Sequence, residues 1–238
     1  MQTIASGRLI RICCLCGLVG STLFLVGDML FYGTLSSGAQ FHPYTEMAER
    51  SVEQLVIGGT LGPVAAVFSA VGMGIFGLTL ASANRRLAWA AAALLAIMMV
   101  IGGAYHAIYA VFGFAAKIGE ESVREALTGQ VANLRNTISY PMYATGIAGS
   151  ALVYFLALWK RTQFPRWLLI FLPTTLSMVE QGFRGLFRAI PAPLGGIVRG
   201  GWINGSFVLF FAIATCHFWR TEIREISPAK VMFNSNRQ

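Results

Sequence analysis

Long apolar runs are the feature that most restricts what this chain can fold into. A helix crosses the hydrocarbon core of a bilayer in about 20 residues, and the sequence contains about six such runs, three of them plain and three with polar interruptions. Hydrophobic residues make up 55% of the 238 residues and charged residues only 12%, whereas an ordinary soluble domain has about 25% charged residues. We therefore expect an integral membrane protein.

The apolar runs indicate helices rather than strands. Transmembrane strands would appear as segments of about ten residues with alternating polarity, and the sequence shows no such alternation. We therefore predict an all-α, polytopic transmembrane helix bundle that forms a single integral membrane domain over residues 1–238. The predicted spans are residues 10–35, 54–82, 87–115, 137–160, 166–189 and 196–219.

The basic residues are distributed as in a membrane protein rather than as in a nucleic-acid-binding protein. The net charge is +8, but the Lys and Arg residues are dispersed in short turns, such as Arg85 and Arg86, and in the C-terminal tail. A basic amphipathic face is absent, so nucleic acid is not an expected partner. The loops between these basic turns alternate with them along the chain, and the loop at 36–54 is slightly acidic. By the positive-inside rule both termini are cytoplasmic, and we expect a multi-pass protein of the cell membrane, in a bacterium the inner membrane.

Ionisable groups inside the predicted spans are the strongest functional signal. Each costs about 2.5–3.5 kcal/mol at a helix centre on insertion scales, so such groups normally face the interior of a bundle. At a rise of about 1.5 Å per residue, Asp28, His106 and Glu180 fall in one layer in the outer half of the membrane, and we take them as candidate catalytic residues of a polar pocket. The candidate substrate-binding residues near this layer are Tyr32, Tyr105, Tyr109, Tyr143, Arg184, Arg199, Trp202 and Asn204.

A structural role for the same residues is the alternative interpretation. Tyr and Arg side chains near an interface can simply reach the head groups, and Glu180 and Arg184, one turn apart on a continuous helix, would neutralise each other. The sequence has no phosphate-binding loop, dinucleotide fingerprint, H-E-x-x-H or C-x-x-C-H motif. We therefore expect neither a cofactor nor a metal.

One short motif carries a family resemblance. Residues 27–33, GDMLFYG, together with six spans and short basic turns, resemble bacterial multi-pass membrane proteins that are classed as domains of unknown function. The resemblance covers most of the chain and implies no activity. A looser similarity, through His106, Glu180, Trp202 and Asn204, is to the emopamil-binding sterol isomerase group, in which buried polar residues handle an amphiphile within the membrane, although the number and spacing of the spans differ.

Three functions are compatible with a polar layer inside a helix bundle. The first is binding of a lipid-like amphiphile, or acid–base chemistry on it, with membrane lipids and a hydrophobic small molecule as partners. The second is a small transporter or permease coupled to protons or anions. The third is a non-catalytic membrane scaffold. Nothing in the sequence specifies an oligomeric state.

The charge distribution predicts the orientation of the chain. Because the basic turns alternate with the slightly acidic loop, a green fluorescent protein fused to the C-terminus should fluoresce and alkaline phosphatase fused there should be inactive. Activity of the phosphatase without fluorescence would show that the C-terminus faces outward and would overturn the predicted topology.

Overall fold

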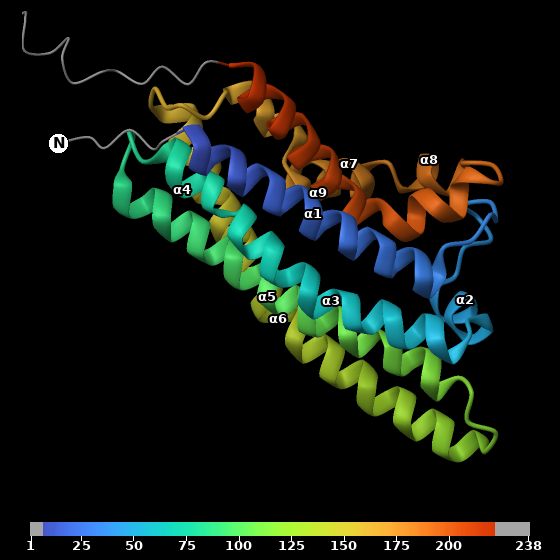
Figure 1. Ribbon diagram of the computed structural model, residues 1–238. Coiled ribbons are helices and arrows are strands. Elements are labelled where there is room, and N and C mark those ends of the chain that lie inside the picture. The colour runs from blue at the N-terminus through green and yellow to red at the C-terminus, as the bar shows by residue number, and fades with distance from the viewer. Residues whose placement is uncertain (1–6, 222–238) are drawn as a thin grey trace, which may run out of the picture.

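Ten helical segments follow one another along residues 7–221, the part of the chain that the computed structural model describes (Figure 1). Within these residues five stretches are long and apolar enough to cross a membrane, namely α1, α3 with α4, α5, α6 and α9. The prediction of an all-α polytopic bundle is therefore confirmed. The segments are α1 (Gly7–Tyr32), α2 (Pro43–Glu49), α3 (Val52–Gly72), α4 (Gly74–Leu80), α5 (Arg85–Ala115), α6 (Glu121–Trp159), η1 (Arg166–Phe171), α7 (Pro173–Gly182), α8 (Arg184–Ala189) and α9 (Leu194–Arg220).

Glycines bring α1 and α3 close together along their length. A Cβ atom at Gly20 of α1 would lie 2.5 Å from the backbone nitrogen of Ser69 and 2.7 Å from the carbonyl oxygen of Ala65, both in α3. At Gly72 of α3 it would lie 2.4 Å from the Cα atom of Gly17. Small residues allow such backbone contact in membranes, where packing replaces the hydrophobic driving force.

The second crossing is made of two helices, with α3 starting at a clear cap. Ser51 accepts a hydrogen bond from the backbone of Gln54 and its own backbone N–H is bound by the Gln54 side chain, which forms a capping box. The helix contains Pro63 and ends at Gly72, and α4 continues after Met73. The predicted span 54–82 thus exists as an interrupted helix.

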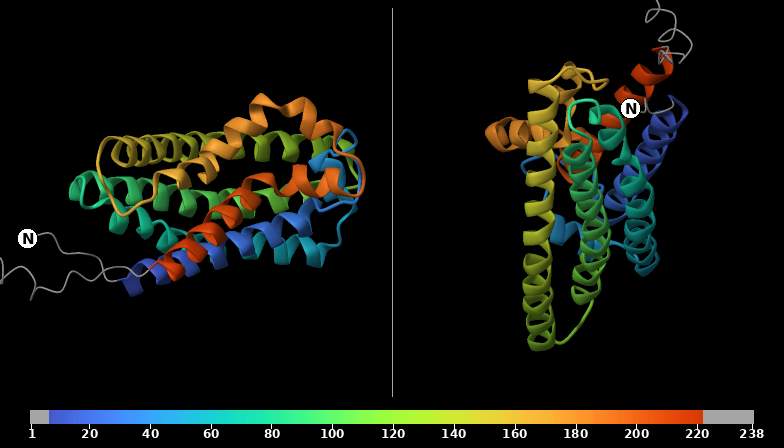
Figure 2. Two further views of the ribbon diagram at one scale, coloured as in Figure 1. Left: turned by 90° about the horizontal axis from the view of Figure 1, so that it is seen from above. Right: turned by 90° about the vertical axis from the view of Figure 1, so that its left-hand side faces the viewer.

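The α6 helix is longer than the predicted span 137–160. Its 39 residues correspond to about 58 Å, so that it continues well beyond a hydrocarbon core of about 30 Å. The right-hand view of Figure 2 shows the loop between α5 and α6 projecting beyond the ends of the other helices. The polar N-terminal part of α6 therefore extends past the apolar part of the bundle.

The fifth predicted span, 166–189, is not a continuous helix, and this prediction was wrong. The segment forms η1, α7 and α8 instead. Pro173 has no N–H to donate to the carbonyl of Leu169, which accepts a hydrogen bond from the Thr175 hydroxyl at 2.6 Å. A second interruption follows at Phe183, between α7 and α8. The described chain therefore contains five stretches that are long and apolar enough to cross a membrane, rather than about six.

The broken segment still runs along the bundle, so that α9 returns to the end at which α1 begins (Figure 2, left). There, Arg11 Nε of α1 donates a 3.2 Å hydrogen bond to the carbonyl of Phe218 in α9. The Arg11 guanidinium also lies 5.5 Å from the centre of the Trp219 ring. Both ends of the described chain thus lie on one side of the bundle.

The close contact of α1 and α3 predicts that alanine destabilises the protein at a glycine in this contact but not at a glycine outside it. Gly20→Ala should lower the unfolding temperature of the protein in detergent, by the equivalent of about 1–3 kcal/mol, because the added methyl group meets backbone atoms that cannot rotate away. Gly205→Ala in α9 is the matched control, since a Cβ there meets nothing within 4 Å and alanine favours the helix. Equal losses in the two variants would contradict the proposed packing.

Candidate functional site

Asp28 is buried where α1 faces α5 and α9, and its carboxylate is surrounded by donors. The Tyr32 hydroxyl donates to Oδ1 at 2.6 Å, from one turn further along α1. The Asn204 amide of α9 donates to Oδ2, also at 2.6 Å. His106 Nε2 of α5 lies 3.2 Å from Oδ1. A carboxylate is costly to bury in an apolar surrounding unless its oxygens are hydrogen-bonded, and here Tyr32 of α1 and Asn204 of α9 supply one donor to each oxygen.

The imidazole of His106 fits into a space that two glycines leave open. A Cβ atom on Gly27 of α1 would lie 2.5 Å from Cε1 of the ring, and one on Gly62 of α3 would lie 3.0 Å from Nδ1. The Phe31 ring packs against the imidazole at 4.8 Å between centroids, and Phe24 lies at 5.5 Å. The ring is therefore held between α1 and α3. Neither Nδ1 nor Nε2 has a hydrogen-bond partner among residues 7–221, although Nε2 lies near the Asp28 carboxylate.

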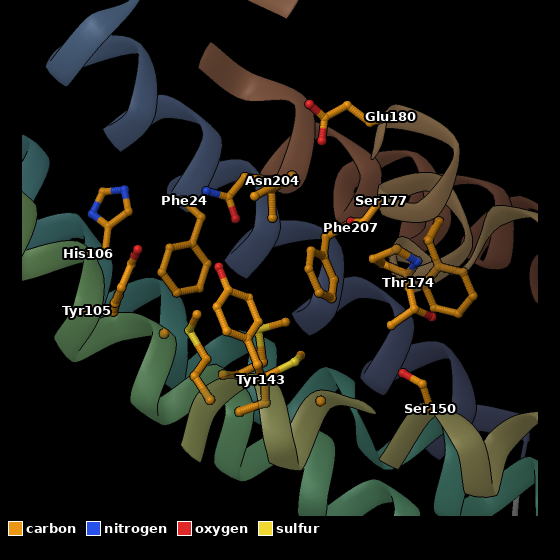
Figure 3. A pocket seen from close by; sticks show the side chains of 18 of the residues that line it. Phe24, Tyr105, His106, Tyr143, Ser150, Thr174, Ser177, Glu180, Asn204 and Phe207 are labelled. Atoms are coloured by element: carbon orange, nitrogen blue, oxygen red, sulfur yellow. The ribbon is translucent and has the colours of Figure 1, made fainter. Parts of the chain in front are cut away.

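A cavity of about 710 Å³ begins at this cluster and extends along the bundle between α1, α5, α6, α7 and α9. Figure 3 shows Tyr105, Tyr143, Ser177 and Asn204 arranged around it. The lining residues from Leu95 to Tyr109 lie on one helix and cover about 21 Å at the helical rise. Such a length is about two thirds of the hydrocarbon thickness of a bilayer.

The two ends of the cavity differ in polarity. The end at Asp28 is lined by hydroxyl, amide, imidazole and charged side chains. The other end, nearer the termini of the described chain, is lined mainly by apolar side chains, together with the hydroxyl groups of Ser150 and Thr174. Those apolar side chains are Met73, Phe76, Leu95, Met98, Met99, Val153, Leu172 and Phe210.

The cavity is open to the side between α6 and α7. Tyr143 and Ile147 of α6 and Met178 of α7 all line it, yet they are 55%, 66% and 72% exposed. In α7 only Pro173 is buried. Ile147 and Met178 are apolar, and a membrane-embedded chain exposes such side chains to lipid.

The structure brings most of the predicted site residues to this cavity. Asp28, His106 and Glu180 all line it, from α1, α5 and α7. Arg184 lines a separate, smaller cavity, and Trp202 is not part of the lining because its Nε1 donates to the carbonyl of Leu176 at 3.2 Å. The predicted binding residues that line the main cavity are Tyr32, Tyr105, Tyr109, Tyr143, Arg199 and Asn204.

The pairing of Glu180 with Arg184 is absent from the structure. The two residues are one turn apart in sequence, but α7 ends at Gly182 and α8 begins at Arg184. Among the described residues Glu180 has no ion-pair partner within 4 Å, and Arg184 donates to the side chain of Gln181. The interrupted helix leaves the Glu180 carboxylate at the cavity without a neutralising partner.

Several lining residues were not apparent from the sequence. Met98 and Met99 lie in a uniformly apolar run, where no residue is distinguished by charge or polarity. Ser150, Thr174 and Ser177 also line the cavity, but their hydroxyl groups are common in membrane helices and commonly bond to the helix backbone. Thr174 and Ser177 could have been found only by recognising that Pro173 starts a new helix.

The fold and the site together define a polytopic helical membrane protein with a buried polar cluster at one end of a laterally open cavity. The chain belongs to the Family of unknown function (DUF6796), whose model matches residues 1–221. This confirms the expectation that the chain belongs to a family of unknown function. Neither a curated protein nor a solved structure matches the chain.

The hydrogen bonds to Asp28 predict coupled effects on stability. Tyr32→Phe and Asn204→Leu should each lower the unfolding temperature in detergent, by the equivalent of about 1–3 kcal/mol, because each leaves a buried carboxylate oxygen with fewer donors. Their effects should not add in the double variant, since both act on one carboxylate. Tyr140→Phe is the control, because the Tyr140 side chain is 74% exposed. Full additivity would show that Asp28 does not link the two residues.

Proposed function

We propose that the protein binds a lipid-like amphiphile of the membrane, with the polar head near Asp28 and the apolar body in the deeper part of the cavity. The observation that carries the proposal is the cavity itself, which is polar at one end, apolar at the other and open laterally between α6 and α7. Its volume of about 710 Å³ is within the range of about 300–1,000 Å³ that is typical of small-molecule sites.

The lateral opening supports entry of the ligand from the bilayer. An amphiphile dissolved in a leaflet already has its apolar body at the depth of the exposed Ile147 and Met178 side chains. Entry between α6 and α7 would therefore require no passage through water. The loosely packed α7 helix, held by Trp202 to α9 and by a contact between Thr175 and Tyr154 to α6, would admit it with little disturbance of the remaining bundle.

Acid–base chemistry on the bound amphiphile is a second candidate, supported by the pairing of Asp28 with His106. The Asp28 carboxylate lies 3.2 Å from Nε2 of His106, and a carboxylate beside an imidazole is a common arrangement in acid–base catalysis. In this case Asp28 would act as the positioning residue and His106 would move the proton. The Glu180 carboxylate, at the same end of the cavity, would complement the pair.

Transport is a third candidate, supported by the interrupted crossings. Transporters often hold their substrate where membrane helices are broken, and both the α3–α4 crossing and the segment from η1 to α8 are interrupted here. Met73, at the first interruption, and Thr174, near the second, line the same cavity. Saturable uptake into proteoliposomes would distinguish this function from binding alone.

We place the protein in the cell membrane with both termini cytoplasmic, in a bacterium in the inner membrane. This orientation rests on the basic turns of the sequence. The polar end of the cavity would then lie in the outer leaflet, which fits an amphiphile of that leaflet.

Native mass spectrometry of the purified protein tests the proposal. The wild type should retain a small amphiphile, and Ser150→Phe should release most of it because the added ring fills the cavity. Ala148→Phe is the matched control, since Ala148 is exposed on α6 and does not line the cavity. Ser177→Phe fills the cavity from α7 and provides a second test if Ser150→Phe fails to fold.

The polar end is tested by Asp28→Asn and His106→Ala in the same measurement. Each should reduce the retained fraction, because each removes a group that lines the proposed head site. A folded wild-type protein that carries no small molecule and takes up none from added lipid would overturn amphiphile binding. Retention that is equal in the cavity-filling variants and in Ala148→Phe would place the lipid on the outside of the bundle.

A further inference from the structure

A second cavity adjoins the polar end of the first, and its lining is basic. It has a volume of about 200 Å³ and is lined by Glu180, Arg184, Phe187, Arg188 and Arg199. Glu180 and Arg199 also line the main cavity, so that the two spaces meet at these side chains. We call this space the arginine annex.

Positive charge is in excess in the arginine annex. Three guanidinium groups face one carboxylate, and no ion pair within 4 Å involves any of them among the residues that the structure describes. Arg184 and Arg188 are exposed and Arg199 is partly buried, and the excess positive charge of this lining attracts an anion. The Phe187 ring, packed on Trp202 at 4.6 Å between centroids, forms the apolar wall.

Arg199 is the anchored member of the three arginines. Its Nη1 donates to the carbonyl of Gly38 at 2.5 Å and to that of Phe41 at 3.3 Å, and the guanidinium lies 5.3 Å from the centre of the Phe41 ring. The structure records no hydrogen bond from its Nε or Nη2 within residues 7–221. The loop between α1 and α2 thus fixes the Arg199 guanidinium, while its Nε and Nη2 stay available to a ligand. Such an arrangement is suited to oxyanions.

We propose that the arginine annex binds a phosphate group carried by the amphiphile in the main cavity. The inference rests on the proposed function, because the phosphate would be covalently attached to the molecule whose apolar body fills the larger space. A phosphate has five heavy atoms, and the annex holds several times the roughly 30 Å³ that one water occupies in the liquid. Planar guanidinium groups recognise phosphate through paired hydrogen bonds. The protein would thereby select phosphate-bearing amphiphiles over neutral ones of equal length.

Substitution of Glu180 distinguishes a phosphate site from a merely structural role of these residues, because the two predict different changes in affinity. The Glu180 carboxylate is the one acidic group in the annex lining, so it opposes a bound anion. Glu180→Gln removes this repulsion with little change in volume. The variant should therefore bind a phosphate amphiphile more tightly than the wild type and a neutral amphiphile no more tightly.

The test compares dodecyl phosphate, dodecanol and inorganic phosphate, each titrated into the full chain in a non-ionic maltoside detergent by isothermal titration calorimetry. We expect a Kd for dodecyl phosphate at least about tenfold lower than that for dodecanol. Arg184→Gln and Arg188→Gln should each reduce this ratio severalfold. Arg161→Gln should leave the ratio unchanged, because this substitution removes an equal charge from a residue that lines neither cavity.

The outcomes separate this proposal from the proposed function. Binding of dodecyl phosphate and dodecanol with equal Kd would overturn the phosphate site and leave amphiphile binding intact. Binding of neither amphiphile would overturn both. Inorganic phosphate that binds as tightly as dodecyl phosphate would show that the annex takes the free anion, and would overturn the attachment to an amphiphile.

Discussion

The burial of the Asp28 carboxylate is the constraint on which the rest of the site depends. An acidic group in the apolar part of a bundle needs donors on both oxygens, and Tyr32 of α1 and Asn204 of α9 supply one each. His106 of α5 lies 3.2 Å from the same carboxylate. The requirement fixes the rotation of these helices about their axes and brings segments more than 170 residues apart in sequence into contact. Gly27 and Gly62 are part of the same arrangement, because side chains there would occupy the place of the imidazole.

The broken fifth crossing accounts for the cavity. A continuous helix over residues 166–189 would present a regular surface to α6 and α9 and would pair Glu180 with Arg184. With Pro173 and Phe183 interrupting it, the segment leaves α7 largely unburied, and Glu180 forms no ion pair with the arginines of α8. The same interruptions thus produce the lateral opening, the unpaired carboxylate and the basic annex. A local departure from helical geometry is typical of functional sites in membrane helices, where irregular backbone lines a cavity.

Much of this arrangement could be predicted from residue types and helical rise alone. Counting along the apolar runs placed Asp28, His106 and Glu180 in one layer, and all three line one cavity in the structure. The break at residue 173 could not be predicted with confidence, since proline is tolerated inside other membrane helices, as Pro63 in α3 and Pro141 in α6 show. The role of Trp202 was also hidden, because its partner is a backbone carbonyl of α7. Backbone acceptors become available only where a helix is interrupted, and sequence patterns do not reveal them.

The central claim, that a membrane amphiphile occupies the cavity with its apolar body directed away from Asp28, is tested most directly by photo-crosslinking. An amphiphile with a diazirine at the end of its alkyl chain would be incorporated with the full-length protein into vesicles, irradiated, and the adducts located by peptide mass spectrometry. Adducts are expected at the apolar end of the cavity, on residues 95–99 of α5 and 207–210 of α9. Adducts confined to the lipid-facing side chains of α3, such as Val64, Val67 and Val71, would contradict it.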